Sequence, residues 1–182
     1  MNKRILVIIV GAAIYAFVVV MVGRMGGAFG LVHHIGLWIA FILLFRYRHP
    51  LMRFLLTFRY PMFFVYVASA LPLMIFEENI NCLPSGCHFI PVTIPFLLLF
   101  IIVLYSIVRF SRVESLSKIL IPACMMGVLW EAVFGVAAAE FQALPLIQFL
   151  YIALWTWMSY AFFTLIPLQY LIEKVRIQAP EA

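Results

Sequence analysis

Charged side chains are scarce in this sequence. Only 10% of its 182 residues are Asp, Glu, Lys or Arg and 67% are hydrophobic, whereas charged residues make up about a quarter of a soluble protein. This composition excludes an ordinary soluble domain and predicts a multi-pass integral membrane protein. We expect it in the plasma membrane, or in the inner membrane if the source is bacterial or archaeal.

Several motifs of known chemistry are also absent. The chain has no HExxH motif or regular histidine box, no Ser or Cys nucleophile at a recognisable distance from a base, and no phosphate-binding glycine loop following a strand. No cofactor is therefore predicted, and a metal bound by His and Glu ranks second to a metal-free site. The net charge of +5 indicates topology and attraction to anionic membrane lipids, not binding to nucleic acid.

Long apolar runs are abundant. An α-helix needs about 20 apolar residues to cross a hydrocarbon core of about 30 Å, and the strands of a membrane barrel would instead alternate apolar with polar residues. We predict one all-α domain, 1–182, with six transmembrane helices at 5–22, 27–45, 61–76, 90–110, 119–138 and 146–172. Residues 50–60 are apolar and basic, and fit either an interfacial helix on the cytoplasmic leaflet or an early start of the third span.

The Lys and Arg residues lie almost entirely on one side of this topology. Only Arg24 of the twelve lies on the other side. The remaining residues are Lys3, Arg4, Arg46, Arg48, Arg53, Arg59, Arg109, Arg112, Lys118, Lys174 and Arg176. Because short cytoplasmic loops carry an excess of basic residues, both termini are predicted to be cytoplasmic.

The segment "FEENINCLPSGCHF", residues 76–89, joins carboxylates, amides, cysteines and a histidine. The topology places it outside, where disulfides persist, and the four residues between Cys82 and Cys87 can turn tightly enough for a disulfide. Cys82 and Cys87 either form this disulfide or remain free thiols, and the sequence favours neither interpretation. A metal site on this one pair is less favoured. Cys124, inside a predicted span, is interpreted as a small buried hydrophobic residue.

Glu131 is the strongest single signal, because an ionisable residue within a span costs about 2.5 to 3.5 kcal/mol to insert. Small residues lie at four-residue steps on either side of it, at Ala123, Gly127, Gly135 and Ala139. This small-residue seam lets helices approach closely, so Glu131 is predicted to face the bundle. It then acts either as a functional carboxylate or as a structural hydrogen bond between helices.

A polar pocket is predicted near the outer face. The histidines of the second span lie at a depth similar to that of Glu131, and Glu77 lies just above that level, near the outer boundary. The second, third and fifth spans would therefore form an outward-opening pocket if they adjoin. The predicted catalytic residues are Glu131, His34 and Glu77. The residues predicted to line the pocket are His33, Glu78, Asn79, Trp130, Tyr151 and Trp155. The alternative is that both glutamates cap the span in contact with water, and it is stronger for Glu78 than for Glu77.

Carboxylates and an imidazole at the edge of a low-dielectric region are suited to proton transfer. The first hypothesis is thus an acid/base enzyme, such as an isomerase, cyclase or hydratase, acting on a lipophilic substrate such as an isoprenoid. The alternative is a non-catalytic subunit that stabilises or assembles a larger complex with a membrane protein partner. A proton- or ion-coupled transporter is weaker, since neither an internal repeat nor paired broken helices are evident.

Overall fold

A computed structural model describes residues 35–81, 90–111, 113, 115–135 and 138–178 of the chain. Over these ranges the protein is all-helical, and five of its helices are long and apolar enough to cross a membrane. They are Ile35–Leu56, α2 (Met62–Asn81), α3 (Ile90–Ser111), α4 (Leu116–Val133) and α6 (Leu146–Gln178), while α5 (Ala138–Ala143) is short. The predicted span 5–22 and the first part of 27–45 lie outside the described residues.

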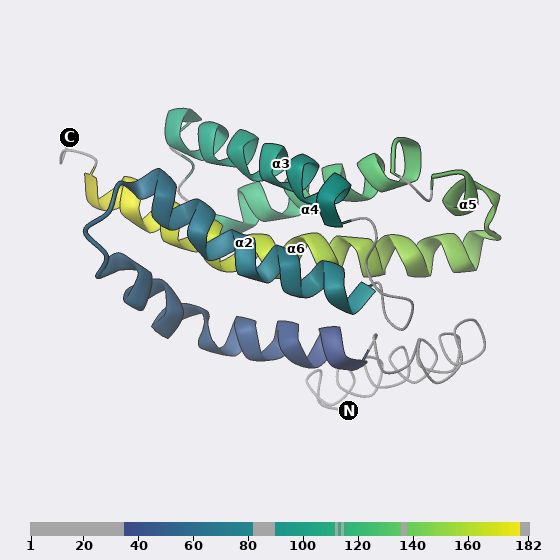
Figure 1. Cartoon of the computed structure of the whole chain (residues 1–182), viewed down its shortest axis with the longest axis horizontal. Helices are drawn as coiled ribbons and strands as arrows, with labels where there is room; N and C mark the ends of the chain where they lie inside the picture. The colour runs from purple at the N-terminus through teal and green to yellow at the C-terminus, as the bar shows by residue number, and fades with distance from the viewer. Residues whose placement is uncertain (1–34, 82–89, 112, 114, 136–137, 179–182) are drawn as a thin grey trace, which may run out of the picture.

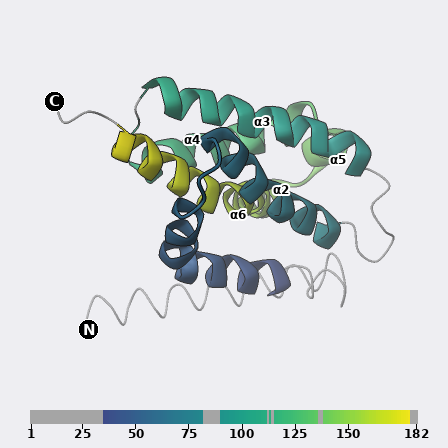
Figure 2. The ribbon, with the colours of Figure 1, turned by 60° about the vertical axis from the view of Figure 1, so that its left-hand side comes forward.

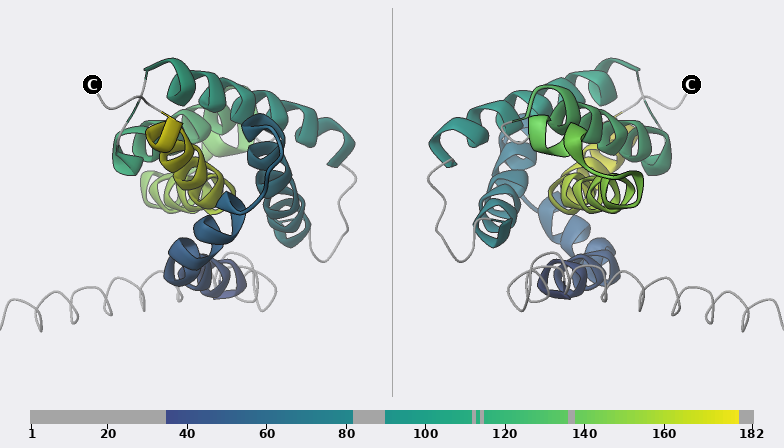
Figure 3. Two further views of the ribbon diagram at one scale, coloured as in Figure 1. Left: turned by 90° about the vertical axis from the view of Figure 1, so that its left-hand side faces the viewer. Right: turned by 90° about the vertical axis from the view of Figure 1, so that its right-hand side faces the viewer.

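The helix Ile35–Leu56 is continuous through Pro50, so residues 50–56 extend the helix before them. Its ribbon changes direction along its length (Figures 2 and 3), as expected when proline removes a backbone hydrogen bond inside a helix. A short connection then leads to α2 at Met62. Contact of residues 50–60 with the membrane surface stays a prediction.

Two other helices differ in length from their predicted spans. α2 continues past residue 76 to Asn81, so Glu77 and Glu78 lie on helical backbone. α4 ends at Val133, short of the predicted residue 138, because the chain turns there. The backbone N–H groups of Phe134 and Gly135 both donate to the carbonyl oxygen of Trp130, at 2.7 and 2.9 Å, which satisfies a carbonyl left open at the helix end.

α6 is the central helix of the fold. It has 33 residues, about 50 Å at 1.5 Å per residue, and packs against α2, α3, α4 and α5 (Figures 1 and 3). From Met158 to Ile172 every side chain except Gln169 is buried. A helix that is apolar on all sides lies either in a protein core or among lipid tails, and here the other helices cover this part of α6.

The helices run in alternating directions, so their ends form two groups (Figure 1). One end of the bundle holds the start of α2 and α4 and the end of α3 and α6. These helix ends carry Arg59, Lys118, Arg109 and Arg176, in agreement with the predicted grouping of basic residues. The carboxyl ends of α2 and α4 lie at the opposite end. The side of the membrane that each end faces stays a prediction.

Interlocking aromatic residues join α2 to α3. Tyr66 is fully buried and its hydroxyl donates to the carbonyl oxygen of Ile101 at 3.0 Å. Tyr105 packs edge-on against Phe63, with 5.1 Å between ring centroids, and lies 5.6 Å from the Tyr66 ring.

Cys124 is buried, as predicted.

Replacing Tyr66 with Phe removes this interhelical hydrogen bond and keeps the ring. We expect Tyr66→Phe to lower the free energy of unfolding by about 0.5 to 1.5 kcal/mol, measured by thermal unfolding in detergent. Tyr60→Phe is the matched control, because Tyr60 is 70% exposed. Equal melting temperatures for the two variants would contradict the role assigned to Tyr66.

Candidate functional site

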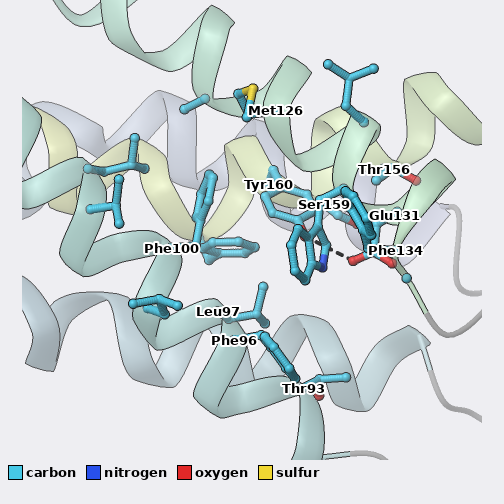
Figure 4. A pocket seen from close by; sticks show the side chains of 18 of the residues that line it. Thr93, Phe96, Leu97, Phe100, Met126, Glu131, Phe134, Thr156, Ser159 and Tyr160 are labelled. Atoms are coloured by element: carbon cyan, nitrogen blue, oxygen red, sulfur yellow. Dashed lines mark hydrogen bonds between the residues drawn. The ribbon is translucent and has the colours of Figure 1, made fainter.

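A cavity of about 930 Å³ lies over α6, between α3 and α4, and reaches the end of α2 (Figure 4). Its wall is mostly apolar, with phenylalanines, leucines and isoleucines from α3 and α4. Apart from two tryptophans, the polar residues that line the cavity are Glu77, Glu78, Thr93, Glu131, Thr156, Ser159 and Tyr160. They come from the carboxyl ends of α2 and α4, the start of α3 and the first half of α6, so the cavity has one polar end.

Tyr160 links α6 to α4 at this polar end. Its hydroxyl donates to Oε1 of Glu131 at 3.0 Å, shown by the dashed line in Figure 4. Glu131 therefore faces the bundle and the cavity, as the small-residue seam predicted. The hydrogen bond leaves acceptor capacity on the carboxyl group, since a carboxylate has two oxygens.

Two glycines of the seam make room for this pair. A Cβ atom on Gly127 would overlap the ring of Tyr160, and a Cβ atom on Gly135 would overlap the carboxyl group of Glu131. Gly127 thus lets the Tyr160 ring lie against the backbone of α4, and Gly135 leaves space for the acid. Ala139, which the sequence placed on the same helical seam, belongs to α5 because α4 ends at Val133.

Both glutamates of α2 join Glu131 at the polar end. Glu77 is 3% exposed, and Glu78, part-buried, accepts a hydrogen bond from the side chain of Thr93. Glu78 interacts electrostatically with Glu131, and Tyr160 interacts with all three carboxyl groups. Glu78 lines the cavity, which differs from the alternative that it only caps the span.

The helices that bring these groups to one cavity include α6. The predicted pocket depended on whether the second, third and fifth spans adjoin. In the structure both α2 and α4 pack mainly on α6, and Tyr160 of α6 forms the hydrogen bond to Glu131 of α4. Ser159 and Thr156 are site residues that were not predicted from the sequence. The available signal was the run "TWMSY", which places them with Tyr160 within about one turn of an apolar helix.

The remaining predicted pocket residues have different outcomes. Trp130 and Trp155 line the cavity. Asn79 and Tyr151 are not among its lining residues, and the Asn79 amide donates to the carbonyl oxygen of Ile75 at 2.7 Å. The predicted residues outside the described part of the chain are His33, His34, Cys82 and Cys87.

The turn after α4 is held by α5. The side-chain amide of Gln142 donates to the carbonyl oxygen of Ala132 at 2.7 Å, one residue after Glu131. Carbonyl groups in the last turn of a helix have no partner within the helix. Gln142 therefore stabilises the backbone that positions Glu131 and Gly135.

In the described ranges, no group of three or more His, Cys, Asp and Glu side chains is arranged to hold a metal ion. No protein-family model, curated protein or solved structure matches the chain.

Gly127→Ala tests the contact between α4 and the Tyr160 ring. Because the added methyl group overlaps that ring, we expect a loss of about 1 to 3 kcal/mol in the free energy of unfolding. Gly36→Ala is the matched control, since a Cβ atom there meets nothing within 4 Å. Thermal unfolding of both variants in one detergent gives the comparison, and a Gly127→Ala variant as stable as Gly36→Ala would refute the close approach.

Proposed function

We propose that the protein is an intramembrane acid/base enzyme of the isomerase, cyclase or hydratase type, acting on a lipophilic substrate. The observation that carries the proposal is that three carboxyl groups, one of them bonded to Tyr160, line the polar end of a large, otherwise apolar cavity. Burying several ionisable groups within membrane-spanning helices is costly, and such groups usually mark functional sites. The predicted topology directs this polar end away from the cytoplasm.

Glu131 and Glu77 are the proposed catalytic pair, with His34 as a third group. A protonated carboxyl group gives its proton to one carbon of a double bond, which forms a C–H bond and leaves a cation on the neighbouring carbon. An ionised carboxylate then removes a proton from a carbon next to the cation, and the electrons of that C–H bond form a new double bond. Isomerisation needs no other reactant.

The same two groups also support cyclisation and hydration. In cyclisation, a second double bond of the substrate attacks the cation before the final proton is lost. In hydration, water adds to the cation and gives a proton to the carboxylate. The aromatic side chains of Trp130, Trp155 and Tyr160 line the same space, and aromatic faces attract cations, so they would stabilise the positively charged intermediate.

Solvent deuterium provides a test that does not require the substrate to be known. When the purified protein is incubated in heavy water with a total lipid extract of its source, we expect one lipid to gain deuterium on carbon, measured by mass spectrometry. Glu131→Gln should abolish the incorporation, because an amide cannot transfer the proton. Glu173→Gln is the matched control: Glu173 forms an ion pair with Arg176 and does not line the cavity. Incorporation that is unchanged in Glu131→Gln would refute the proposal.

A structural role for Glu131 is the second candidate, and one observation favours it. The hydrogen bond from Tyr160 to Glu131 joins α6 to α4, as expected in a non-catalytic subunit whose polar residues hold its helices together. Polar interhelical bonds of this kind contribute about 0.6 kcal/mol on average and at most about 1.7. A partner complex is part of this second candidate.

A double-mutant cycle separates the two candidates. We expect Glu131→Gln to melt close to the wild type, because the Gln carbonyl oxygen still accepts the bond from Tyr160. Because Gln keeps the bond, the cycle uses Glu131→Ala, Tyr160→Phe and their double variant, with an expected coupling free energy of about 0.5 to 1.5 kcal/mol. If Glu131→Gln instead melts far below the wild type and neither protein retains a lipid by mass spectrometry, the structural role is favoured.

A further inference from the structure

Ser159 is a buried hydroxyl group in the cavity wall. It precedes Tyr160 on α6, lines the cavity and is 4% exposed. Its Oγ atom has no hydrogen-bond partner within the described part of the chain. Leaving a buried polar group unsatisfied costs about 1 to 3 kcal/mol, so this hydroxyl is expected to bind a group that enters the cavity.

Several other Ser and Thr hydroxyl groups in the membrane-spanning helices are satisfied locally, although the buried hydroxyl of Tyr170, away from the cavity lining, also has no partner in the described part of the chain. Thr164, five residues further along α6, donates to the carbonyl oxygen of Tyr160, and Ser106 on α3 donates to that of Ile102 at 3.0 Å. Such bonds to a preceding turn are the usual solution for Ser and Thr within a helix. Ser159 departs from this pattern at the point where α6 borders the cavity.

The charges around Ser159 limit what can bind there. The described lining of the cavity includes Glu77, Glu78 and Glu131 and has no Lys, Arg or His. An anionic headgroup such as a phosphate would meet like charge in low-dielectric surroundings, where repulsion is strong. Ionised carboxylates accept hydrogen bonds and do not donate. The preferred polar end of a ligand therefore donates hydrogen bonds and carries no negative charge.

The rest of the cavity fits a hydrocarbon chain. Apolar lining residues extend along α3 from Leu97 to Ile107, about 15 Å of helix, and continue on α4. Several of them are also exposed, including Leu99 and Met126, each at 60%, so the cavity is not closed off along α3 and α4. The cavity thus opens between α3 and α4 toward the region that lipid tails occupy in a membrane, which gives a ligand a lateral entrance.

We infer that the ligand is a long-chain lipid whose polar end is a hydroxyl or amine group, and that Ser159 binds this end beside the three glutamates. The inference rests on the proposed function, since it names the substrate class for the same cavity. It also assigns Ser159 as a binding residue, while proton transfer stays with the glutamates.

Three probes that share one isoprenoid chain test the polar end: the alcohol, the amine and the diphosphate. The full chain is placed in phosphatidylcholine nanodiscs, and binding is followed by the fluorescence of the tryptophans, of which Trp130 and Trp155 line the cavity. We expect saturable binding of the alcohol and the amine, and at least tenfold weaker binding of the diphosphate. Ser159→Ala should weaken binding of the alcohol about threefold to tenfold, whereas the control Ser106→Ala should leave it unchanged.

The outcomes distinguish this inference from the proposed function. If the diphosphate binds as tightly as the alcohol, the assigned polar end is wrong while a lipid-binding cavity stands. If Ser159→Ala binds the alcohol like the wild type, the role of Ser159 is wrong. If none of the three probes binds the wild type saturably, the proposed function fails as well. The probe comparison uses the wild-type chain alone, so it holds even if Ser159→Ala does not fold.

Discussion

The packing of α6 against α2, α3 and α4 determines where every other part of this protein lies. Lipid tails are as apolar as the side chains of α6, so the hydrophobic effect does little to bring these helices together within a membrane. Close contact between side chains and a few interhelical hydrogen bonds must do so instead. The almost complete burial of α6 from Met158 to Ile172 shows how extensive that contact is, and it places Tyr160 where Glu131 of α4 accepts its hydrogen bond.

The polar end of the cavity depends on small residues as much as on charged ones. Gly127 admits the Tyr160 ring and Gly135 leaves room for the Glu131 carboxyl group, so a seam that first indicates helix packing also shapes a site. Gln142 secures the turn that follows, through its bond to Ala132. A buried polar cluster is stable only when its members are satisfied. Glu78 and Glu131 are only part-buried, which leaves this cluster open to a ligand.

Stability and chemistry make opposite demands on this cavity. Apolar residues in place of Glu77 and Glu131 would remove the cost of holding ionisable groups in a low-dielectric region, and larger residues between α3 and α4 would fill about 930 Å³ with packing contacts. The chain keeps the acids and the open space together, at the same end of the bundle. Functional sites commonly retain groups that reduce stability, and this combination favours a catalytic or binding role over a purely structural one.

The sequence by itself determined the membrane class, the helical architecture and the inward direction of Glu131. Composition and run length decide whether a chain can cross a bilayer, and the four-residue spacing of Gly127, Glu131 and Gly135 decides which face of α4 is buried. Counting residues along a helix also gave similar depths for Glu77 and Glu131. Depth is measured along the membrane normal, however, and it contains no information on which helices are neighbours. Only the tertiary structure decided that α2 and α4 both pack on α6, that Tyr160 bonds Glu131, and that Ser159 lines the cavity, because these facts depend on how each helix is rotated and placed beside the others.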